Sequence, residues 1–285
     1  MRRADGSPGP SRRIALGAVL AAAAVAGTPT PLAGGPEREE PRPDGKAAPP
    51  RRHASRLLAA HGRPPFYAAF PLDGLVTNEY AFRHPDTPDA RLHEDWTVTS
   101  GSLFAHRGAG WSGIPDGLSP DPASRLATGS AVLRVVTSRT DFVDVTAGGL
   151  FALRPPGSTP RTPATEWDGG HLWLRYRSPQ ELYSFSFSRR DGTVAIKRKA
   201  PPAGTDEGVY TTLAQTVLPF RYGAWHHVTA RAKNTASRSV RLHLQVAGRL
   251  VLEAEDTAPG SLTGPGAAGV RGDNTELFFR TLTVM

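Results

Sequence analysis

Short runs of β-branched and aromatic residues constrain the fold of this chain more than any other feature of its sequence. They begin at Phe66 and continue to Met285, with Gly, Pro, Asp, Asn and Ser between them. This spacing is typical of antiparallel all-β domains, and helical periodicity is hardly visible. Twelve such runs overfill one sheet, so we expect two stacked sheets. The runs lie near residues 96–99, 102–106, 131–137, 142–153, 171–177, 182–188, 194–199, 210–215, 225–232, 240–246, 250–254 and 276–284.

Two tight turns and the lack of cysteine support one large core. Asp191-Gly192 stands between two strand-like runs, and Ala247-Gly248 separates another two. Glycine accepts the positive φ that a two-residue hairpin turn requires. With no cysteine in the chain, burial alone must hold the fold, which a large sandwich can achieve.

The N-terminal sequence indicates an export signal and a linker. Four arginines precede an uncharged run at residues 14–27 that is rich in alanine, leucine and valine. The run is too short to span a bilayer, which needs about 20 apolar residues. We therefore expect a signal peptide (1–26), a disordered Pro/Gly/Ala-rich linker (27–65) and one folded domain (66–285) in a secreted, extracellular protein.

The export route and the charge bear on location and partners. Ser11-Arg12-Arg13 leaves twin-arginine export and ordinary Sec secretion both open. The formal net charge is +8, and the four arginines and one aspartate of residues 1–26 account for three of these charges, so +5 remains. Because an exported protein rarely meets nucleic acid, we expect no nucleic-acid partner. We expect a monomer with a local basic patch for an acidic polymer.

Three consecutive runs present two distinct faces when they are read with the two-residue period of a strand. One face is apolar and should form the core: Leu172, Leu174, Phe185, Phe187, Val194 and Ile196. The opposite face is cationic and aromatic, and we expect it to bind ligand: His171, Trp173, Arg175, Arg177, Lys197 and Lys199. By the same alternation, Tyr176 and Tyr183 point into the core.

The second face fits an acidic polysaccharide. Arginine and lysine pair with carboxylates or sulfates, and an indole face stacks on a sugar ring. Another interpretation stays open, since a solvated sheet face carries the same basic residues and Trp173 could pack beneath a loop.

Two further patterns raise catalytic and metal-binding hypotheses. Asp168 and His171 stand at a strand entrance and are candidates for acid-base chemistry, although Asp168 followed by two glycines is also typical of a turn. His226 and His227 are neighbours on a strand, so their side chains point to opposite faces. A buried or hydrogen-bonded role is favoured over a metal site there.

Three segments resemble the concanavalin A-like lectin/glucanase superfamily, particularly laminin-G-like bacterial jelly rolls. They are Trp-Thr-Val-Thr-Ser-Gly-Ser-Leu-Phe at 96–104, Trp-His-His-Val at 225–228, and Gly-Val-Arg-Gly-Asp-Asn at 269–274 followed by Phe-Phe-Arg-Thr-Leu-Thr-Val. The resemblance implies a two-sheet antiparallel jelly-roll sandwich that holds any glycan on its concave face. It also implies a structural calcium ion, with Asp73 and Asp273 as candidate ligands.

This superfamily hosts several functions, so three hypotheses remain. The first is a secreted module that binds an acidic polysaccharide. The second is a polysaccharide-degrading enzyme on the same cleft. A hydrolase would need a close pair of carboxyls that the sequence does not offer, while a lyase would use His171, Tyr176 or Tyr183 as base. The third hypothesis is a structural or adhesion sandwich.

Overall fold

The structure is a computed structural model that describes residues 64–116, 118, 121–127, 130 and 132–285. The expected signal peptide (1–26) and residues 27–63 of the expected linker lie outside the described residues. In the described part of the chain, no helix has the length and apolar character that crossing a membrane requires.

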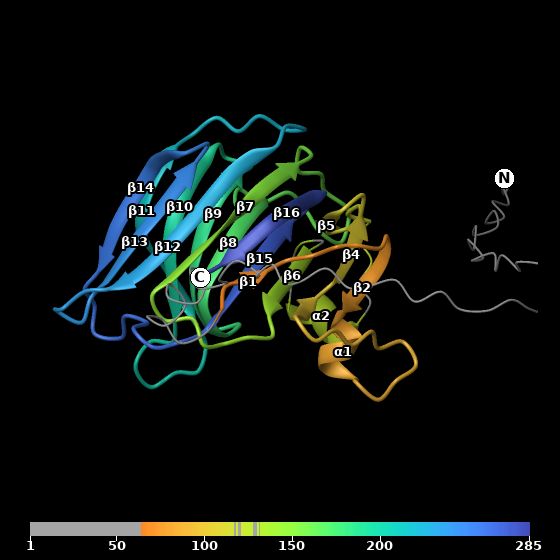
Figure 1. The fold of residues 1–285 in the computed structure, drawn as a ribbon, viewed down its shortest axis with the longest axis horizontal. Coiled ribbons are helices and arrows are strands. Elements are labelled where there is room, and N and C mark those ends of the chain that lie inside the picture. The colour runs from red at the N-terminus through yellow and green to blue at the C-terminus, as the bar shows by residue number, and fades with distance from the viewer. Residues whose placement is uncertain (1–63, 117, 119–120, 128–129, 131) are drawn as a thin grey trace, which may run out of the picture. The chain divides into compact units, whose positions relative to one another are not determined.

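The described residues form two antiparallel sheets, which confirms the all-β expectation (Figure 1). One sheet contains β1 (Phe66–Tyr67), β2 (Gly74–Asn78), β4 (Ser102–His106), β5 (Ala109–Trp111), β7 (Val145–Leu153), β12 (His226–Asn234), β13 (Val240–Val246), β14 (Arg249–Asp256) and β16 (Leu277–Val284). Its strand order is β14-β13-β12-β7-β16-β5-β4-β2, and β1 pairs with β16.

The other sheet positions the candidate site. It contains β3 (Trp96–Ser100), β6 (Val132–Thr137), β8 (Gly169–Ser178), β9 (Glu181–Arg189), β10 (Thr193–Ala200), β11 (Val209–Val217) and β15 (Ala267–Asp273). The order is β11-β10-β9-β8-β15-β6-β3. Two short helices, α1 (Glu79–Arg83) and α2 (Pro122–Ala127), lie in the connections that follow β2 and precede β6.

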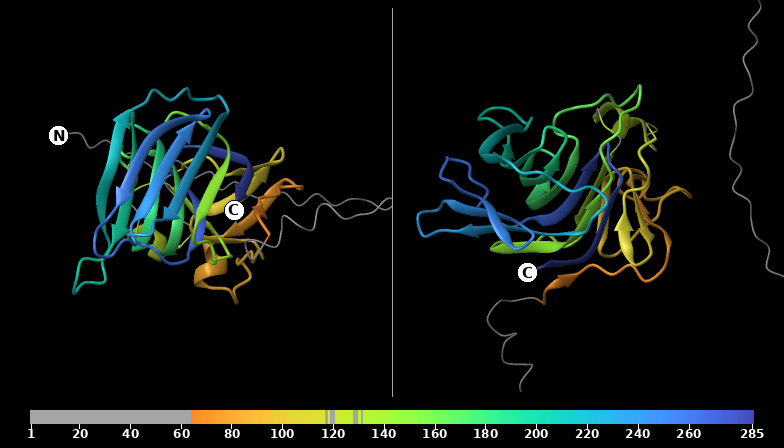
Figure 2. Two further views of the ribbon diagram at one scale, coloured as in Figure 1. Left: turned by 60° about the vertical axis from the view of Figure 1, so that its left-hand side comes forward. Right: turned by 90° about the horizontal axis from the view of Figure 1, so that it is seen from above.

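The core lies between the two sheets, which stack as layers in Figures 1 and 2. The six residues assigned to the core face of β8, β9 and β10 are all fully buried there. Phe187 of one sheet contacts Phe151 of the other, with ring centroids 5.0 Å apart. Burying such a side chain contributes about 1.5–3 kcal/mol, so this interlayer contact stabilises the sandwich.

Both predicted hairpins are present. Gly192, with a φ of 75°, joins β9 to β10, which pair antiparallel. Ala247 and Gly248 both have positive φ, 51° and 75°, and join β13 to β14. Their left-handed backbone matches the twist of the flanking strands.

The sequence did not predict β15, an interior strand of its sheet that lies between β8 and β6. Its alanines and glycines are depleted in strands, so their pattern favours a loop. Close packing explains the glycine at position 269, because a Cβ there would lie 2.6 Å from the Val135 carbonyl oxygen. Only a glycine permits that close approach of two backbones.

A β-bulge in β8 overturns two expected side-chain orientations. The register shifts after Leu174, and Arg175 has a φ of 50°. The extra residue interrupts the two-residue alternation. Arg175 therefore enters the protein interior instead of the open face, whereas Tyr176 turns to the open face instead of the core.

Arg175 links β8 to the opposite sheet. Its side chain is fully buried, and its guanidinium donates to the carbonyl oxygens of Val143 (2.8 Å), Leu262 (2.6 Å) and Ala232 (3.4 Å). It also donates to Oδ1 of Asn234 at 2.7 Å. Burial lowers the pKa of Arg175, and the dense set of acceptors stabilises its charge.

We predict that Arg175→Ala lowers the free energy of unfolding by about 3 kcal/mol, because several buried acceptors lose their donor. Urea denaturation followed by circular dichroism measures the change. Arg177→Ala is the matched control: this neighbouring arginine is partly exposed, and its loss should change stability by less than about 1 kcal/mol. Equal effects of the two substitutions would contradict the buried role.

Candidate functional site

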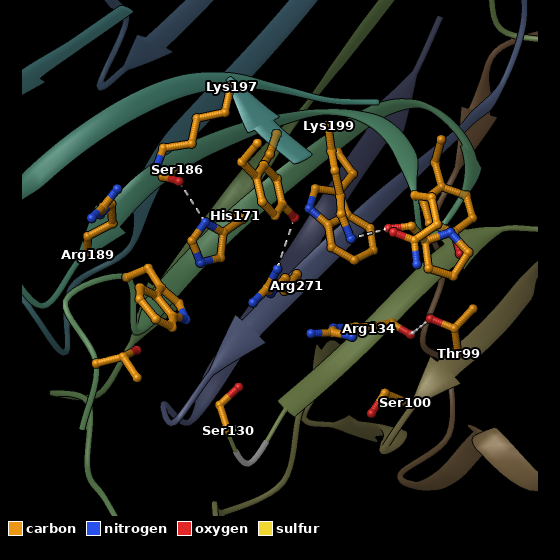
Figure 3. Close-up of a pocket in the computed structure, with 18 of the residues that line it drawn as sticks. Thr99, Ser100, Ser130, Arg134, His171, Ser186, Arg189, Lys197, Lys199 and Arg271 are labelled. Carbon is orange, nitrogen blue, oxygen red and sulfur yellow. Dashed lines mark hydrogen bonds between the residues drawn. The ribbon is translucent and has the colours of Figure 1, made fainter. Parts of the chain in front are cut away.

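A pocket of about 620 Å³ lies on the face of the seven-stranded sheet that points away from the core (Figure 3). Every strand of this sheet contributes to its lining, together with α1 and the segment before β8. The side chains that alternate with the core residues of β8, β9 and β10 form its floor. The alternation of side chains along the pleated strands therefore produces the floor of the pocket.

Cationic side chains dominate the lining: Arg83, Arg134, Arg189, Lys197, Lys199 and Arg271. The described residues that line the pocket include no Asp and no Glu. Carboxylates outside the lining pair with three of the six, since Arg83 lies 3.6 Å from Asp121, and Arg189 and Arg271 each lie 2.5 Å from an aspartate. No ion pair within the described part of the chain involves the other three cations.

These cations repel one another. Burial lowers the pKa of Arg134 to about 10, and the nearby charge of Arg271 adds to this effect. Burial also lowers the pKa of Lys199, and Arg134 and Arg271 lower it further. An anion in the pocket would relieve both the desolvation and the repulsion.

Asp273 is the buried counter-charge beneath the floor. Its carboxylate lies 2.5 Å from Nε of Arg271 and 3.2 Å from Nε2 of His171, and it accepts a hydrogen bond from Ser130 at 2.8 Å. Burial alone would raise the pKa of Asp273, but Arg271 and His171 hold that pKa well below its usual range. Asp273 therefore stays ionised and fixes both neighbours in position.

His171 is a neutral base at the centre of the floor. Its Nδ1 lies 2.8 Å from the hydroxyl of Ser186 (Figure 3). Its Nε2 lies 3.2 Å from the carboxylate of Asp273. Burial lowers the pKa of His171 below its usual value, and the repulsion of Arg271 and Arg189 opposes the attraction of Asp273. The imidazole is thus uncharged at neutral pH, and its burial makes it a weaker base than a free histidine.

Trp173 lies in the wall of the pocket and is only 2% exposed. Its ring stacks on Tyr176, with centroids 5.5 Å apart and an interplanar angle of 9°, and the Arg271 guanidinium lies 5.8 Å from its centroid. The indole therefore supports other pocket residues and offers little surface to a sugar. The exposed aromatic side chains at this site are Phe82, Trp167 and Tyr210.

The structure gathers four of the six predicted binding residues: His171, Trp173, Lys197 and Lys199. Arg175 is buried between the sheets, as described above. Arg177 does not line the pocket, and it donates to the carbonyl oxygen of Pro265 and approaches Glu181. Whether any of these residues binds ligand stays a prediction.

Asp168 does not pair with His171. It is buried and accepts hydrogen bonds from Thr165, Arg190 and Asn274, so it holds the loop that precedes β8. These contacts agree with the interpretation of Asp168 as a turn residue.

Sequence analysis missed Arg134, Arg189 and Arg271, and it directed Tyr176 to the core between the sheets, whereas this side chain packs on the pocket side. Arg134 interrupts the apolar run of β6, which signals a charged side chain on the open face. Arg271 had no such signal, because β15 was not predicted as a strand.

The two candidate calcium ligands share no contact partner. Asp73 is exposed and accepts from the backbone N–H of Arg107 at 2.7 Å, whereas Asp273 belongs to the buried network. The described residues contain no group of three or more His, Cys, Asp or Glu arranged for a metal ion. These two residues therefore do not fit a joint calcium site. His226 is hydrogen-bonded, with Nε2 2.8 Å from the Arg221 carbonyl oxygen.

No protein-family model and no curated protein matches the chain, but solved structures do. The carbohydrate-binding module CBM66 from Bacillus subtilis is 14% identical, with a TM-score of 0.46 over 67% of this chain and 94% of the module. The potassium-bound carbohydrate recognition domain of Emp46p is 10% identical, with a TM-score of 0.45 over 76% and 95%. A Bacillus subtilis protein of unknown function with a galectin-like fold is 11% identical, with a TM-score of 0.44 over 78% and 97%.

Two of these neighbours are named as a carbohydrate-binding module and a carbohydrate recognition domain, and the third as a protein with a galectin-like fold. Identities and TM-scores this low carry no information about what this chain binds. The pocket itself has to supply that argument.

We predict that Asp273→Asn lowers the free energy of unfolding by about 3 kcal/mol at neutral pH, because Arg271 loses its buried partner. The folded-state pKa of Asp273 lies below its usual value, so its stabilisation is present above about pH 4 and is lost as the pH falls further. The difference between wild type and variant should therefore shrink below about pH 4.

Urea denaturation at a series of pH values measures this difference. Asp206→Asn, at an exposed aspartate outside the pocket, is the control and should leave stability nearly unchanged. A difference that stays constant down to the lowest pH would contradict the buried counter-charge.

Proposed function

We propose that this chain is a secreted module that binds an acidic polysaccharide in the pocket of the seven-stranded sheet. One observation carries the proposal: six cationic side chains converge on a lining whose described residues include no carboxylate. A sheet face that merely contacts solvent would not need all of its charges to have the same sign, and it would leave its histidine and arginines exposed.

The shape and chemistry of the pocket support a saccharide. A volume of about 620 Å³ falls within the range of about 300–1,000 Å³ typical of ligand sites. Guanidinium groups bind carboxylates in a forked geometry, and small serines such as Ser184 and Ser186 leave space above the floor. The exposed rings of Trp167 and Tyr210 offer flat apolar faces to sugar rings.

We predict that the double variant Arg134→Gln, Lys199→Gln binds uronate oligosaccharides at least about tenfold more weakly than the wild type, because two cations without an acidic partner are lost. Isothermal titration calorimetry with tetrasaccharides of polygalacturonate and alginate measures the affinity. Binding should also weaken as salt is raised.

The matched control is Arg241→Gln, at an exposed arginine of β13 outside the pocket. Cellotetraose tests the need for charge, and an oligonucleotide of equal charge tests the need for a sugar acid. Equal affinity of the double variant and the wild type for every uronate would overturn the proposal, as would preference for the oligonucleotide.

A second candidate function is a polysaccharide lyase, and the reorientation of Tyr176 favours it. Strand alternation in the sequence predicts that this tyrosine points into the core, which counts against the lyase hypothesis. The β8 bulge instead turns it toward the pocket, beside the cations. The hydrolase alternative gains no such support, since the described lining lacks the pair of carboxyls that glycoside hydrolysis uses. A featureless face would favour the adhesion hypothesis, and this pocket is not featureless.

The elimination can be written with residues of the pocket. Arg134 and Arg271 would neutralise the uronate carboxylate, which acidifies the proton at C5. His171 or Tyr176 would take that proton as base. The C5–H electron pair then forms the C4=C5 double bond, the C4–O bond breaks, and the leaving oxygen receives a proton from a pocket hydroxyl.

We predict that Tyr176→Phe lowers any lyase rate by about 100-fold or more while uronate binding stays within a few-fold, because only a proton-transferring hydroxyl is removed. The unsaturated product absorbs in the near ultraviolet, so the rate is read directly. Tyr67→Phe, an exposed tyrosine outside the pocket, is the control. If uronates bind but yield no unsaturated product, the lyase hypothesis is wrong and the binding module remains as the proposed function.

A further inference from the structure

A second hollow, of about 490 Å³, lies on the outer face of the nine-stranded sheet. It shares no lining residue with the pocket described above. Its lining comes from β4, β5, β7 and β16, from the β4–β5 turn and from residues before β12. We call it the outer hollow.

A ladder of three aromatic side chains crosses β4, β5 and β16, and two of them, Trp111 and Phe278, form one wall of the outer hollow. Trp111 is paired in register with Phe104 on one side and Phe278 on the other, at ring-centroid distances of 5.7 and 5.9 Å. Its ring is nearly parallel to that of Phe278, and its Nε1–H donates to Glu276 at 3.0 Å. The indole is therefore held rigidly in one orientation.

The other wall is Trp225, which is 39% exposed. The guanidinium of Arg280 lies 4.3 Å from the centre of its ring. Ala152 lies between the two walls and pairs with Phe278. Its small side chain leaves the floor of the outer hollow low. Cross-strand packing accounts for the ladder, but it does not account for an exposed indole facing that ladder across a hollow.

The charge of the outer hollow selects the ligand. Three arginines line it, Arg107, Arg154 and Arg280, whereas Glu276 is the acidic residue in its described lining. Arg154 lies 3.9 Å from Glu276, and Trp111 also donates to that carboxylate. Flat apolar walls with surplus guanidinium groups suit a ligand that combines a ring face, hydroxyls and negative charge.

We propose that the outer hollow is a second binding site for an acidic saccharide, so that one chain holds two saccharide segments on opposite sheets. The choice of an acidic saccharide as ligand rests on the function proposed above, but this second site depends on a separate set of residues. Two sites on opposite faces cannot be spanned by a short oligosaccharide, so the protein would cross-link polymer chains.

Calorimetric titration of the full chain with the uronate tetrasaccharides tests the stoichiometry. The wild type should bind about two ligands per chain, and each single-site variant about one. Trp225→Ala and Arg154→Gln, both at exposed side chains, together remove the outer hollow; Arg134→Gln and Lys199→Gln together impair the pocket. Tyr67→Ala controls for loss of an exposed ring elsewhere.

A second readout is the turbidity of long polygalacturonate or alginate mixed with protein. The wild type should cross-link the polymer, and either pair of substitutions should abolish the turbidity while circular dichroism stays unchanged. Affinity at the outer hollow should fall at least about tenfold when Trp225 and Arg154 are replaced.

The two proposals can fail separately. Wild-type binding of one ligand that the outer variant leaves unchanged and the pocket variant removes would overturn the second site and keep the first. Binding that only the outer variant removes would keep the second site and overturn the first. Absence of uronate binding by the wild type would overturn both.

Discussion

Asp273 is the buried negative charge on which the cationic floor of the pocket depends. It lies on β15 without exposed surface, and it contacts Arg271, His171 and Ser130. Without this carboxylate, a buried guanidinium would stand beside Arg134 and Lys199 with no compensating charge. Because the carboxylate lies beneath the lining, the surface that a ligand meets stays positive while the interior stays balanced.

The β8 bulge decides which side chains meet that surface. The extra residue at Arg175 sends a guanidinium across the core to backbone carbonyls of the opposite side and turns Tyr176 outward onto Trp173. The same local distortion therefore fastens the two layers together and places a hydroxyl among the cations. This hydroxyl separates the binding hypothesis from the lyase hypothesis in chemical terms.

The two sheets carry different surfaces, and we have proposed the same class of ligand for both. The pocket relies on buried charge with exposed rings at its margin, whereas the outer hollow relies on a rigid aromatic wall with guanidinium groups around it. Under these two proposals, a chain that holds acidic polymer on both faces would act as a cross-linker, with or without catalysis in the pocket. The hairpin at Gly192 keeps β9 and β10, and hence Ser186 and Lys197, in the register that the pocket requires.

Local sequence determined the all-β class, both predicted hairpins and the core faces of β8, β9 and β10, because the two-residue period of a strand and the φ preference of glycine act between near neighbours. It also brought His171, Trp173, Lys197 and Lys199 to one face. Only the tertiary structure decided the rest. The glycine-rich β15 forms a strand because its backbone packs closely against β6, and this places Arg271 and Asp273 between β8 and β6 in the interior of the sheet. The burial of Arg175 between the sheets and the turn of Tyr176 to the pocket side depend on acceptors that lie far away along the chain, which no local pattern encodes.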